Sequence, residues 1–458
     1  MLETALKIWI KRSLLFLLAL IVFYAVARFV DVYTGSMITG ARAPYLQLPT
    51  SHSVVLRWQT DAAIRGQVRY GAQPDQLDKT ASEAGPETLH SLALDGLEAD
   101  TRYYYAVADT GDKNPDYDSA APSWFRTLPL AGSPRPTRLW AIGDSGDPGP
   151  VANAVRDAAS RWMAAHPRPG YPDFDVWLGL GDLAYTSGTD QQYQASLFAT
   201  YAAQLKDHAF WPVYGNHDAR RWTYFTLFTL PEQAEAGGVA SNTEHYYSFD
   251  YGQVHIIVLD SQDSSRAADG EMAQWLRRDL AQSKSQWLIA AFHHPPYSKG
   301  THDSDKASDS GGRMSEMREN ILPILEAGGV DLVLSGHSHM YERSYLLDCH
   351  YGTSDSFSAA NIVSNGIAHL NADYLKPVDR QADAGTVYVV AGSSSKVDNG
   401  PINHPATPVS MLEAGSLVID IDGEQMTTRF INNKGEVRDQ FSIRKPAGYQ
   451  SSYAGCKR

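Results

Sequence analysis

The sequence predicts an α/β body preceded by a smaller all-β domain, and three features of the chain support this division. From about residue 137 onward, apolar strand-like runs alternate with helical stretches, which is the order typical of α/β domains. Residues 43–127 instead show short segments of strand composition separated by turn residues, which is typical of an all-β sandwich. The proline-rich stretch between them, Leu128–Pro136, favours a linker. A chain of 458 residues is also long for one domain.

We therefore expect five segments in chain order. They are an N-terminal signal peptide or membrane anchor (1–36), an all-β domain (37–128), a linker (129–136), the α/β body (137–445) with a less regular insertion at about 346–384, and a loose tail (446–458). With 43% hydrophobic and 20% charged residues, the chain has ample material for a large core.

The N-terminal segment places Lys7, Lys11 and Arg12 before the apolar run Leu14–Val26. Basic residues before a short apolar run are typical of an export signal, and Ala25-Val26-Ala27 fits a small-residue cleavage site. The run is shorter than the roughly 20 residues of a comfortable spanning helix. A cleaved signal and a retained anchor therefore both stay open, with a buried amphipathic helix as the alternative. Either of the first two places the rest of the chain outside the cytoplasm.

Composition restricts the partners. A net charge of -13 argues against a nucleic-acid surface, which is normally basic, and a phosphate-bearing substrate would need local cations to attract it. The two cysteines, Cys349 and Cys456, cannot build a cysteine-based zinc site. In an oxidising compartment they can pair, and two unrelated free thiols are the alternative.

The all-β domain contains strand-like segments at Ser53–Thr60 and Gly66–Tyr70. The following stretch, Leu97–Val107, resembles the Leu-x-Pro-x-Thr-x-Tyr-x-x-x-Val signature of fibronectin type III domains, with Ala99 in place of the proline. The resemblance implies that Tyr103 is the corner tyrosine, whose hydroxyl bonds back to the backbone.

In the body, one helix is expected at Asn153–Ala165. Strands are expected at Arg138–Ile142, Asp175–Gly181, Phe210–Tyr214, Tyr246–Phe249, Val254–Leu259, Gln286–Phe292, Val330–Leu334, Gly385–Val390 and Gly415–Ile421. Ser393-Ser-Ser-Lys396 fits the Ser-x-x-Lys motif of serine β-lactamases, but their other motifs are absent, so a loop after a strand is expected there.

Polar side chains follow five of these strands at the point where each ends. They are Asp144, Asp182 with Tyr185, Asn216 with His217, His293, and His337 with His339. Ligands bind beyond the carboxyl ends of strands in open α/β sheets. Oxygen and imidazole donors without thiolate suit zinc, manganese and iron, and a two-metal site can clamp a phosphoryl displacement. Each residue alone fits an ordinary turn or a polar side chain, but five successive strand ends argue against coincidence.

The order Gly-Asp-x-Gly, Gly-Asp-x-x-Tyr, Gly-Asn-His-Asp, His, Gly-His-x-His resembles the purple acid phosphatases within the metallophosphoesterase superfamily. Gly146 stands where common superfamily members have a histidine, Tyr185 is the extra ligand, and the run Gly336–Ser344 continues with Tyr-Glu-Arg as that family often does. The resemblance covers residues 137–344, and the preceding fibronectin III-like domain fits the plant-type architecture. It implies a metallophosphoesterase-like β-sandwich flanked by helices.

The resemblance also implies the roles of the site residues. An Fe(3+) site would use Asp144, Tyr185, His339 and the bridging Asp182, and a divalent site for iron, zinc or manganese would use Asp182, Asn216, His293 and His337. His293 is preferred to His294 because of its offset behind the strand. His217 would face the substrate and stabilise the phosphoryl transition state. His302, the only histidine in the loop 297–306, is a second candidate catalytic residue, with an exposed loop residue as the alternative.

These features predict an exported binuclear-metal phosphoesterase of the acid phosphatase type, which hydrolyses phosphate monoesters by attack of metal-activated hydroxide. A phosphodiesterase or nucleotide-cleaving enzyme with the same site is the alternative, and a cell-surface binding module is a third hypothesis. The expected partner is a phosphate-ester substrate, with no nucleic acid, and with a membrane only through the N-terminal segment. The natural substrate, the second metal and the oligomeric state stay open.

Overall fold

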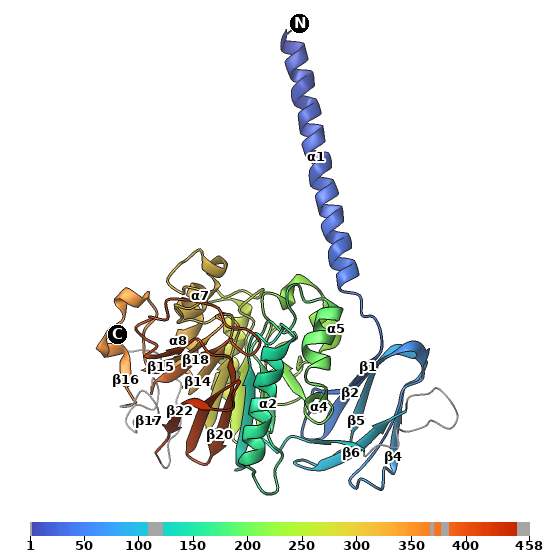
Figure 1. Cartoon of the computed structure of the whole chain (residues 1–458), viewed down its shortest axis with the longest axis vertical. Helices are drawn as coiled ribbons and strands as arrows, with labels where there is room; N and C mark the ends of the chain where they lie inside the picture. Colours follow the sequence, from blue (N-terminus) through green and yellow to red (C-terminus); the bar gives the residue numbers. More distant parts are fainter. Residues whose placement is uncertain (1, 109–121, 367–370, 377–383, 447–458) are drawn as a thin grey trace.

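The computed structural model describes residues 2–108, 122–366, 371–376 and 384–446 (Figure 1). A long helix stands away from a body that consists of a small β-sandwich and a larger two-sheet domain with helices on its outside. This arrangement confirms the expected fold class.

The small sandwich pairs a three-stranded sheet of order β1-β2-β5 with a four-stranded sheet of order β4-β3-β6-β7. Its strands are β1 (Arg42–Gln47), β2 (Ser53–Ile64), β3 (Gln67–Gly71), β4 (Lys79–Ser82), β5 (Glu87–Asp95), β6 (Arg102–Val107) and β7 (Ser123–Arg126). Alternate residues of the strands face inward, so Leu56, Val68 and Leu94 lie in its core. The Tyr103 hydroxyl accepts a hydrogen bond from the Glu98 N–H at 3.0 Å, which confirms the expected corner tyrosine.

The large domain packs two sheets face to face. The first, of order β10-β9-β8-β20-β21-β22-β17, contains β8 (Thr137–Ile142), β9 (Val176–Gly179), β10 (Phe210–Pro212), β17 (Ala372–Leu375), β20 (Gly415–Asp422), β21 (Gln425–Asn432) and β22 (Val437–Arg444). The second, of order β11-β12-β13-β14-β18-β15-β16 with β19 paired to β15, contains β11 (Tyr247–Tyr251), β12 (Val254–Val258), β13 (Trp287–Ala291), β14 (Leu332–Ser335), β15 (Tyr341–Leu347), β16 (Ile362–Ser364), β18 (Thr386–Ala391) and β19 (Val409–Met411). One core joins the sheets, with Trp140 and Leu178 from the first and Ile256 and Leu334 from the second.

The remaining elements are helices and helical turns, which cover the outer faces and the loops, except for α1, which stands away from the body. They are α1 (Leu2–Gly35), α2 (Pro150–Ala165), α3 (Asp190–Tyr193), η1 (Gln194–Ala199), α4 (Ala202–Leu205), η2 (Asp218–Arg220), α5 (Thr223–Leu227), α6 (Glu271–Gln282), η3 (Asp309–Gly312), α7 (Arg313–Glu316), η4 (Met317–Ile321), α8 (Leu322–Ala327), η5 (Ser354–Ser356) and η6 (Ala359–Asn361). The helix expected near residue 153 is α2, which begins at Pro150 because proline suits the first turn of a helix.

Strand direction explains where a site can form. Strands β8, β9 and β10 run parallel in one sheet, and β12, β13, β14 and β18 run parallel in the other. The carboxyl ends of β8, β9, β10, β13 and β14, which precede all the predicted ligands, therefore gather at one edge of the domain. We call this edge the cluster edge.

The hairpin of β21 and β22 was not predicted from the sequence. Both strands extend the first sheet beyond β20 by antiparallel pairing, from Asp422 opposite Gln425 to Gln425 opposite Arg444. Within the predicted insertion, β16 joins the edge of the second sheet and β17 joins the edge of the first. Cys349 in this insertion is disulfide-bonded, which excludes a free thiol there, while Cys456 and residues 447–458 of the tail lie outside the described residues.

Candidate metal centre

Three predicted ligands form one group at the cluster edge. The Tyr185 hydroxyl donates to Asp144 Oδ1 at 2.9 Å, and His339 Nε2 lies 3.0 Å from the same hydroxyl oxygen. His339 Nε2 is also 3.5 Å from Asp144 Oδ1. A carboxylate, a phenol and an imidazole therefore converge on one point, although they follow three different strands.

The other four predicted ligands form an adjacent group. His293 Nε2 lies 3.1 Å from Asn216 Oδ1, 3.5 Å from Asp182 Oδ2 and 3.2 Å from His337 Nδ1. The ligand atoms of Asp182, His293 and His337 all lie within 4.8 Å of one another, which is close enough for one metal ion. The His337 N–H donates to Asp144 Oδ2 at 2.7 Å and ties the two groups together.

The backbone at three of these residues adopts a conformation that favours glycine. Asp144, Asp182 and His337 have φ values of 52°, 52° and 68°, in the left-handed region. Such a residue costs on the order of 1 kcal/mol or more, and it persists only where the surrounding structure enforces it. The sharp turn lets each side chain leave its strand end and point into the cluster.

Gly146 shows why the common histidine cannot stand at this position. A Cβ atom there would lie 2.5 Å from the Ala184 backbone nitrogen and 2.6 Å from the Asp182 carbonyl oxygen. The Gly146 N–H donates to the Asp182 carbonyl at 3.0 Å, and the Tyr185 N–H donates to the Gly146 carbonyl at 2.9 Å. The loop that carries Tyr185 therefore occupies the space that a side chain would need. The glycine at 146 and the tyrosine at 185, which both depart from the common superfamily pattern, therefore belong to one structural feature.

Comparison with known proteins agrees with this geometry. Residues 137–341 match the calcineurin-like phosphoesterase family, and residues 42–127 match the N-terminal domain of purple acid phosphatases. Together the two matches support the purple acid phosphatase family. Purple acid phosphatase 21 of Arabidopsis thaliana is 28% identical over 314 residues, which cover 64% of this chain and 63% of that protein. Phosphoenolpyruvate phosphatase of Allium cepa is 27% identical over 325 residues, which cover 64% of this chain and 60% of that protein.

The chain thus spans about three fifths of the length of these purple acid phosphatase relatives. Among solved structures, purple acid phosphatase PPD1 from yellow lupin (Lupinus luteus) seeds aligns with a TM-score of 0.67 at 17% identity, covering 89% of this chain and 75% of that one. The structure of PhoD aligns with a TM-score of 0.60 at 14% identity, covering 92% of each chain. At these identities the two structures show a shared fold.

The geometry agrees with the choice of His293, rather than the adjacent His294, as a predicted ligand. His293 Nδ1 lies 2.9 Å from the Leu180 carbonyl oxygen, which directs Nε2 into the second group of ligands. His294 instead turns its Nδ1 to the Ser261 hydroxyl at 2.9 Å. His293 is therefore the histidine that faces the ligand groups.

In the second group, the opposite charges of Asp182 and His293 stabilise each other. Burial opposes ionisation of Asp182, but the charge and hydrogen bond of His293 outweigh burial and lower the pKa of the carboxyl below its usual value. Burial also disfavours charged His293, but Asp182 and Asp144 raise the pKa of its imidazole to about 9. Burial, together with the neighbouring histidines, holds the pKa of His337 well below its usual value. Without a metal the group keeps a proton on His293, which a bound cation would displace.

The two candidate catalytic histidines flank the ligands. His217 Nδ1 lies 2.6 Å from the Thr186 carbonyl oxygen, and its Nε2 lies 3.9 Å from Asp182 Oδ2. The His302 ring stacks on the His337 ring at 3.9 Å, and its Nδ1 lies 2.9 Å from Asp309 Oδ1. His302 thus lies against a predicted ligand, although its side chain is still 30% exposed.

Two aspartates that support the cluster edge were not singled out from the sequence. Buried Asp218 accepts hydrogen bonds from the Leu183 N–H at 3.0 Å, the Gly215 N–H at 3.1 Å and the Tyr193 hydroxyl at 2.7 Å. Burial and the charge of Asp182 raise the pKa of Asp218 to about 7. Asp398 Oδ2 lies 2.5 Å from His339 Nδ1. The position of Asp218 in Gly-Asn-His-Asp was the available signal, whereas nothing local marks Asp398.

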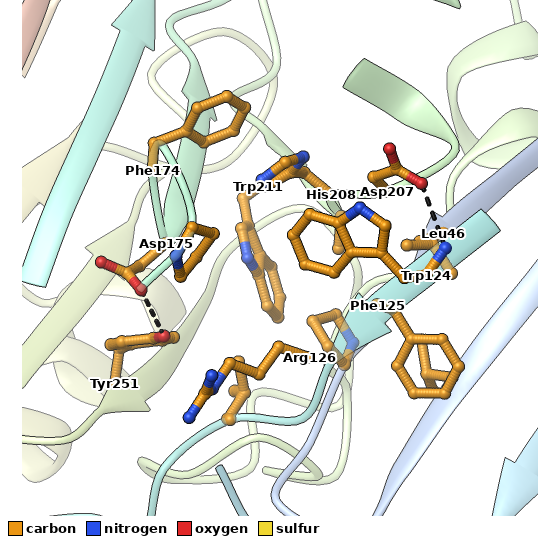
Figure 2. Close-up of a pocket in the computed structure, with 15 residues that line it drawn as sticks. Leu46, Trp124, Phe125, Arg126, Phe174, Asp175, Asp207, His208, Trp211 and Tyr251 are labelled. Carbon is orange, nitrogen blue, oxygen red and sulfur yellow. Dashed lines mark hydrogen bonds between the residues drawn. The ribbon is translucent and has the colours of Figure 1, made fainter. Parts of the chain in front are cut away.

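A separate cavity lies between the small sandwich and the large domain (Figure 2). It has a volume of about 30 Å³, is lined by Trp124, Phe174, His208 and Trp211 among others, and contains none of the predicted site residues. That space suits one or two water molecules and is too small for a phosphate ester.

The Ser393–Lys396 loop follows β18, as expected, and Ser394 Oγ accepts from the Gly143 N–H at 3.1 Å, so it supports the strand end before Asp144.

Proposed function

We propose that this chain is a binuclear-metal phosphoesterase that hydrolyses phosphate monoesters. The observation that carries the proposal is the convergence of seven oxygen and imidazole donors from five strand ends into two adjacent groups. The relatives named purple acid phosphatase and phosphoenolpyruvate phosphatase support a phosphatase, and phosphoenolpyruvate is itself a phosphate monoester.

The donor sets fit two different ions. We infer that Asp144, Tyr185 and His339 hold Fe(3+), since a phenolate is a hard ligand, and that Asn216, His293 and His337 hold a divalent iron, zinc or manganese ion. Asp182 would serve both sites, since its carboxylate has two oxygens and can bind one ion with each. The chemistry that two such cations supply is a water molecule of lowered pKa and neutralisation of phosphoryl charge.

The side chains around the ligands bind and orient the ester. We infer that His217 faces the phosphoryl group, because its Nδ1–H is held by the Thr186 carbonyl and its Nε2 is left on the side of Asp182. When Nε2 is protonated as well, the ring can donate from there to a phosphoryl oxygen in the transition state and protonate the departing oxygen. His302, held by Asp309 and stacked on His337, is the second imidazole within reach of the ester.

We further propose that the protein is exported. Within the described residues, α1 is long and apolar enough to cross a membrane, with a mean hydropathy of 2.4 in its most apolar window, and a signal sequence fits the same composition. The disulfide at Cys349 supports an oxidising compartment, because disulfides are rare in the cytosol.

The proposed activity is tested with nitrophenyl phosphate and bis-nitrophenyl phosphate from acidic to neutral pH. We expect turnover of the monoester with an acidic optimum, and its loss in Asp182→Ala, which removes the carboxylate shared by both sites. A preference for the diester would favour the phosphodiesterase alternative. Turnover by neither substrate in protein shown to contain two metals would refute the proposal.

A further inference from the structure

The C-terminal end of α1 is bonded to the loop that follows two predicted site residues. Asp31 Oδ2 accepts from Arg221 Nη2 at 2.8 Å, and Ser36 Oγ accepts from the Trp222 N–H at 3.0 Å. The loop 217–222 begins at His217, whose N–H donates to Asp182 Oδ1 at 2.8 Å. The helix end is thus only a few residues away from the proposed metal centre.

A second set of contacts fixes the short connection between α1 and β1. The Thr39 N–H donates to Asp190 Oδ2 at 2.9 Å, and Arg42 Nη2 donates to Asp190 Oδ1 at 2.5 Å. Asp190 opens α3, the helix that follows the loop carrying Tyr185. The loop 217–222 holds the end of α1, and Asp190 holds the connection that follows it. These two attachments give α1 a defined direction relative to the body.

That direction places the cluster edge toward the surface of any membrane that α1 crosses. The helix rises from the end of the body where α5 and α7, which follow loops of the cluster edge, also lie (Figure 1). The basic residues near the start of α1 favour the cytoplasmic side for its N-terminus and the opposite side for the body.

The length of α1 sets how far the loop 217–222 lies from the hydrocarbon core of the membrane. The exposed ion pair of Arg28 and Asp31 marks the end of the apolar run, and Gly35 lies about 10 Å farther along the axis. This distance is comparable to the headgroup layer of a bilayer. The run between Arg12 and Arg28 is short for a membrane, and the long basic side chains at its two ends compensate by reaching toward the headgroups.

The side chains at this level suit a membrane interface. Trp222 is 55% exposed beside the helix end, and tryptophan is the residue enriched where headgroups meet hydrocarbon. Arg220 is exposed on the same loop, whereas Arg221 is buried and paired with Asp31, so Arg220 is the cationic group that faces solvent there. Anionic headgroups attract such groups.

We propose that α1 is retained as an anchor and that the enzyme acts on phosphate monoester headgroups of lipids in that same membrane. The reaction adds water across the terminal P–O ester bond, and it releases inorganic phosphate and the lipid alcohol. A lipid substrate reaches a site that faces the bilayer by lateral diffusion, whereas a soluble ester must enter the gap between the body and the membrane. This inference rests on the proposed function and adds the substrate class.

The test uses the full chain reconstituted in phosphatidylcholine vesicles that contain phosphatidic acid, with nitrophenyl phosphate as the soluble substrate. The comparison variant carries a flexible Gly/Ser insertion of about 20 residues between Ser36 and Met37, which frees the body to move roughly 25 Å from the membrane. We expect unchanged turnover of nitrophenyl phosphate and a loss of about tenfold or more in phosphatidic acid turnover, because the effective concentration falls.

A matched pair of surface variants tests the contact residue. Trp222→Ser should lower phosphatidic acid turnover several-fold and leave nitrophenyl phosphate turnover unchanged. Leu130→Ser is the control, because Leu130 is 56% exposed in the linker before the amino end of β8, away from the cluster edge. It should change neither activity.

Three results would overturn the inference. They are equal phosphatidic acid turnover with and without the insertion, no phosphatidic acid turnover by protein that hydrolyses nitrophenyl phosphate, and removal of α1 from the protein produced in cells, measured by mass spectrometry. Failure to hydrolyse nitrophenyl phosphate in metal-loaded protein would instead refute the proposed function itself.

Discussion

Substitution of Gly146 by alanine is expected to damage the metal centre although Gly146 is not a ligand. The new Cβ would meet three backbone atoms at once, the Ala184 nitrogen at 2.5 Å, the Asp182 oxygen at 2.6 Å and the Leu183 carbonyl carbon at 2.7 Å. Real Cβ contacts of this kind are essentially absent, and backbone cannot swing aside as a flexible side chain does. The loop 182–185 must therefore move.

The size of the effect follows from what that loop carries. Overpacking a close contact of this kind costs about 1–3 kcal/mol of folding free energy. A shift of about 1 Å in catalytic geometry costs on the order of 10²-fold in rate. Because Asp182 and Tyr185 lie on the displaced loop, we expect Gly146→Ala to bind less metal, to melt at a lower temperature and to lose most of its phosphatase activity.

The assay measures metal content, the midpoint of thermal unfolding and nitrophenyl phosphate turnover in the same preparations. Gly85→Ala is the matched control, because Gly85 has no heavy atom within 4 Å of an added Cβ and should tolerate it or gain a little stability. Wild-type metal content and activity in Gly146→Ala would refute the steric argument for why Tyr185 accompanies Gly146.

Three further predictions test the ligands and the charges of the fold. Tyr185→Phe should abolish a visible charge-transfer band while far-UV circular dichroism stays unchanged, and a mutant that keeps the colour would show that Tyr185 does not bind iron. Asp182→Ala should lose both metals by elemental analysis, and retention of one ion at full occupancy would contradict the bridging role. Burial opposes charge on His255, but hydrogen bonds to Asp250 and Asp279, each 2.8 Å long, raise its pKa to about 9. The contribution of charged His255 to the free energy of unfolding, up to roughly 3 kcal/mol, is fully present below about pH 6.5 and is lost as the pH rises toward 9. The difference in unfolding midpoint between wild type and His255→Gln should therefore shrink over that range, and a constant difference would contradict the assignment.

The sequence by itself predicted the fold class and the donor residues, because both depend on local patterns. An apolar run that ends in glycine and a polar side chain marks a strand end wherever it stands, as at Gly181-Asp182 and Gly336-His337. Four such ends, and a fifth at Phe292-His293 that lacks the glycine, place the oxygen and imidazole donors on loops whatever the pairing of the strands. The fibronectin-like signature around Tyr103 is local in the same way.

Features without a local pattern required the structure. The hairpin of β21 and β22 was not predicted because its residues mix polar and apolar types without a clear strand pattern, and its strands are defined by their pairing next to β20. Asp398 gave no signal, since it reaches His339 from a loop 59 residues farther along the chain. The steric reason for Gly146 depends on where the loop 182–185 passes over it.

Which donors share an ion, and which way the centre faces, were decided only by the tertiary structure. The grouping of Asp144 with Tyr185 and His339 depends on the strand order within each sheet and on left-handed turns at the strand ends. The direction of α1 depends on bonds from Asp31 and Ser36 to the loop 217–222, far away in the chain. A sequence records the chemistry of each residue and its neighbours, whereas distances between loops are set by long-range packing, which no short window of residues contains.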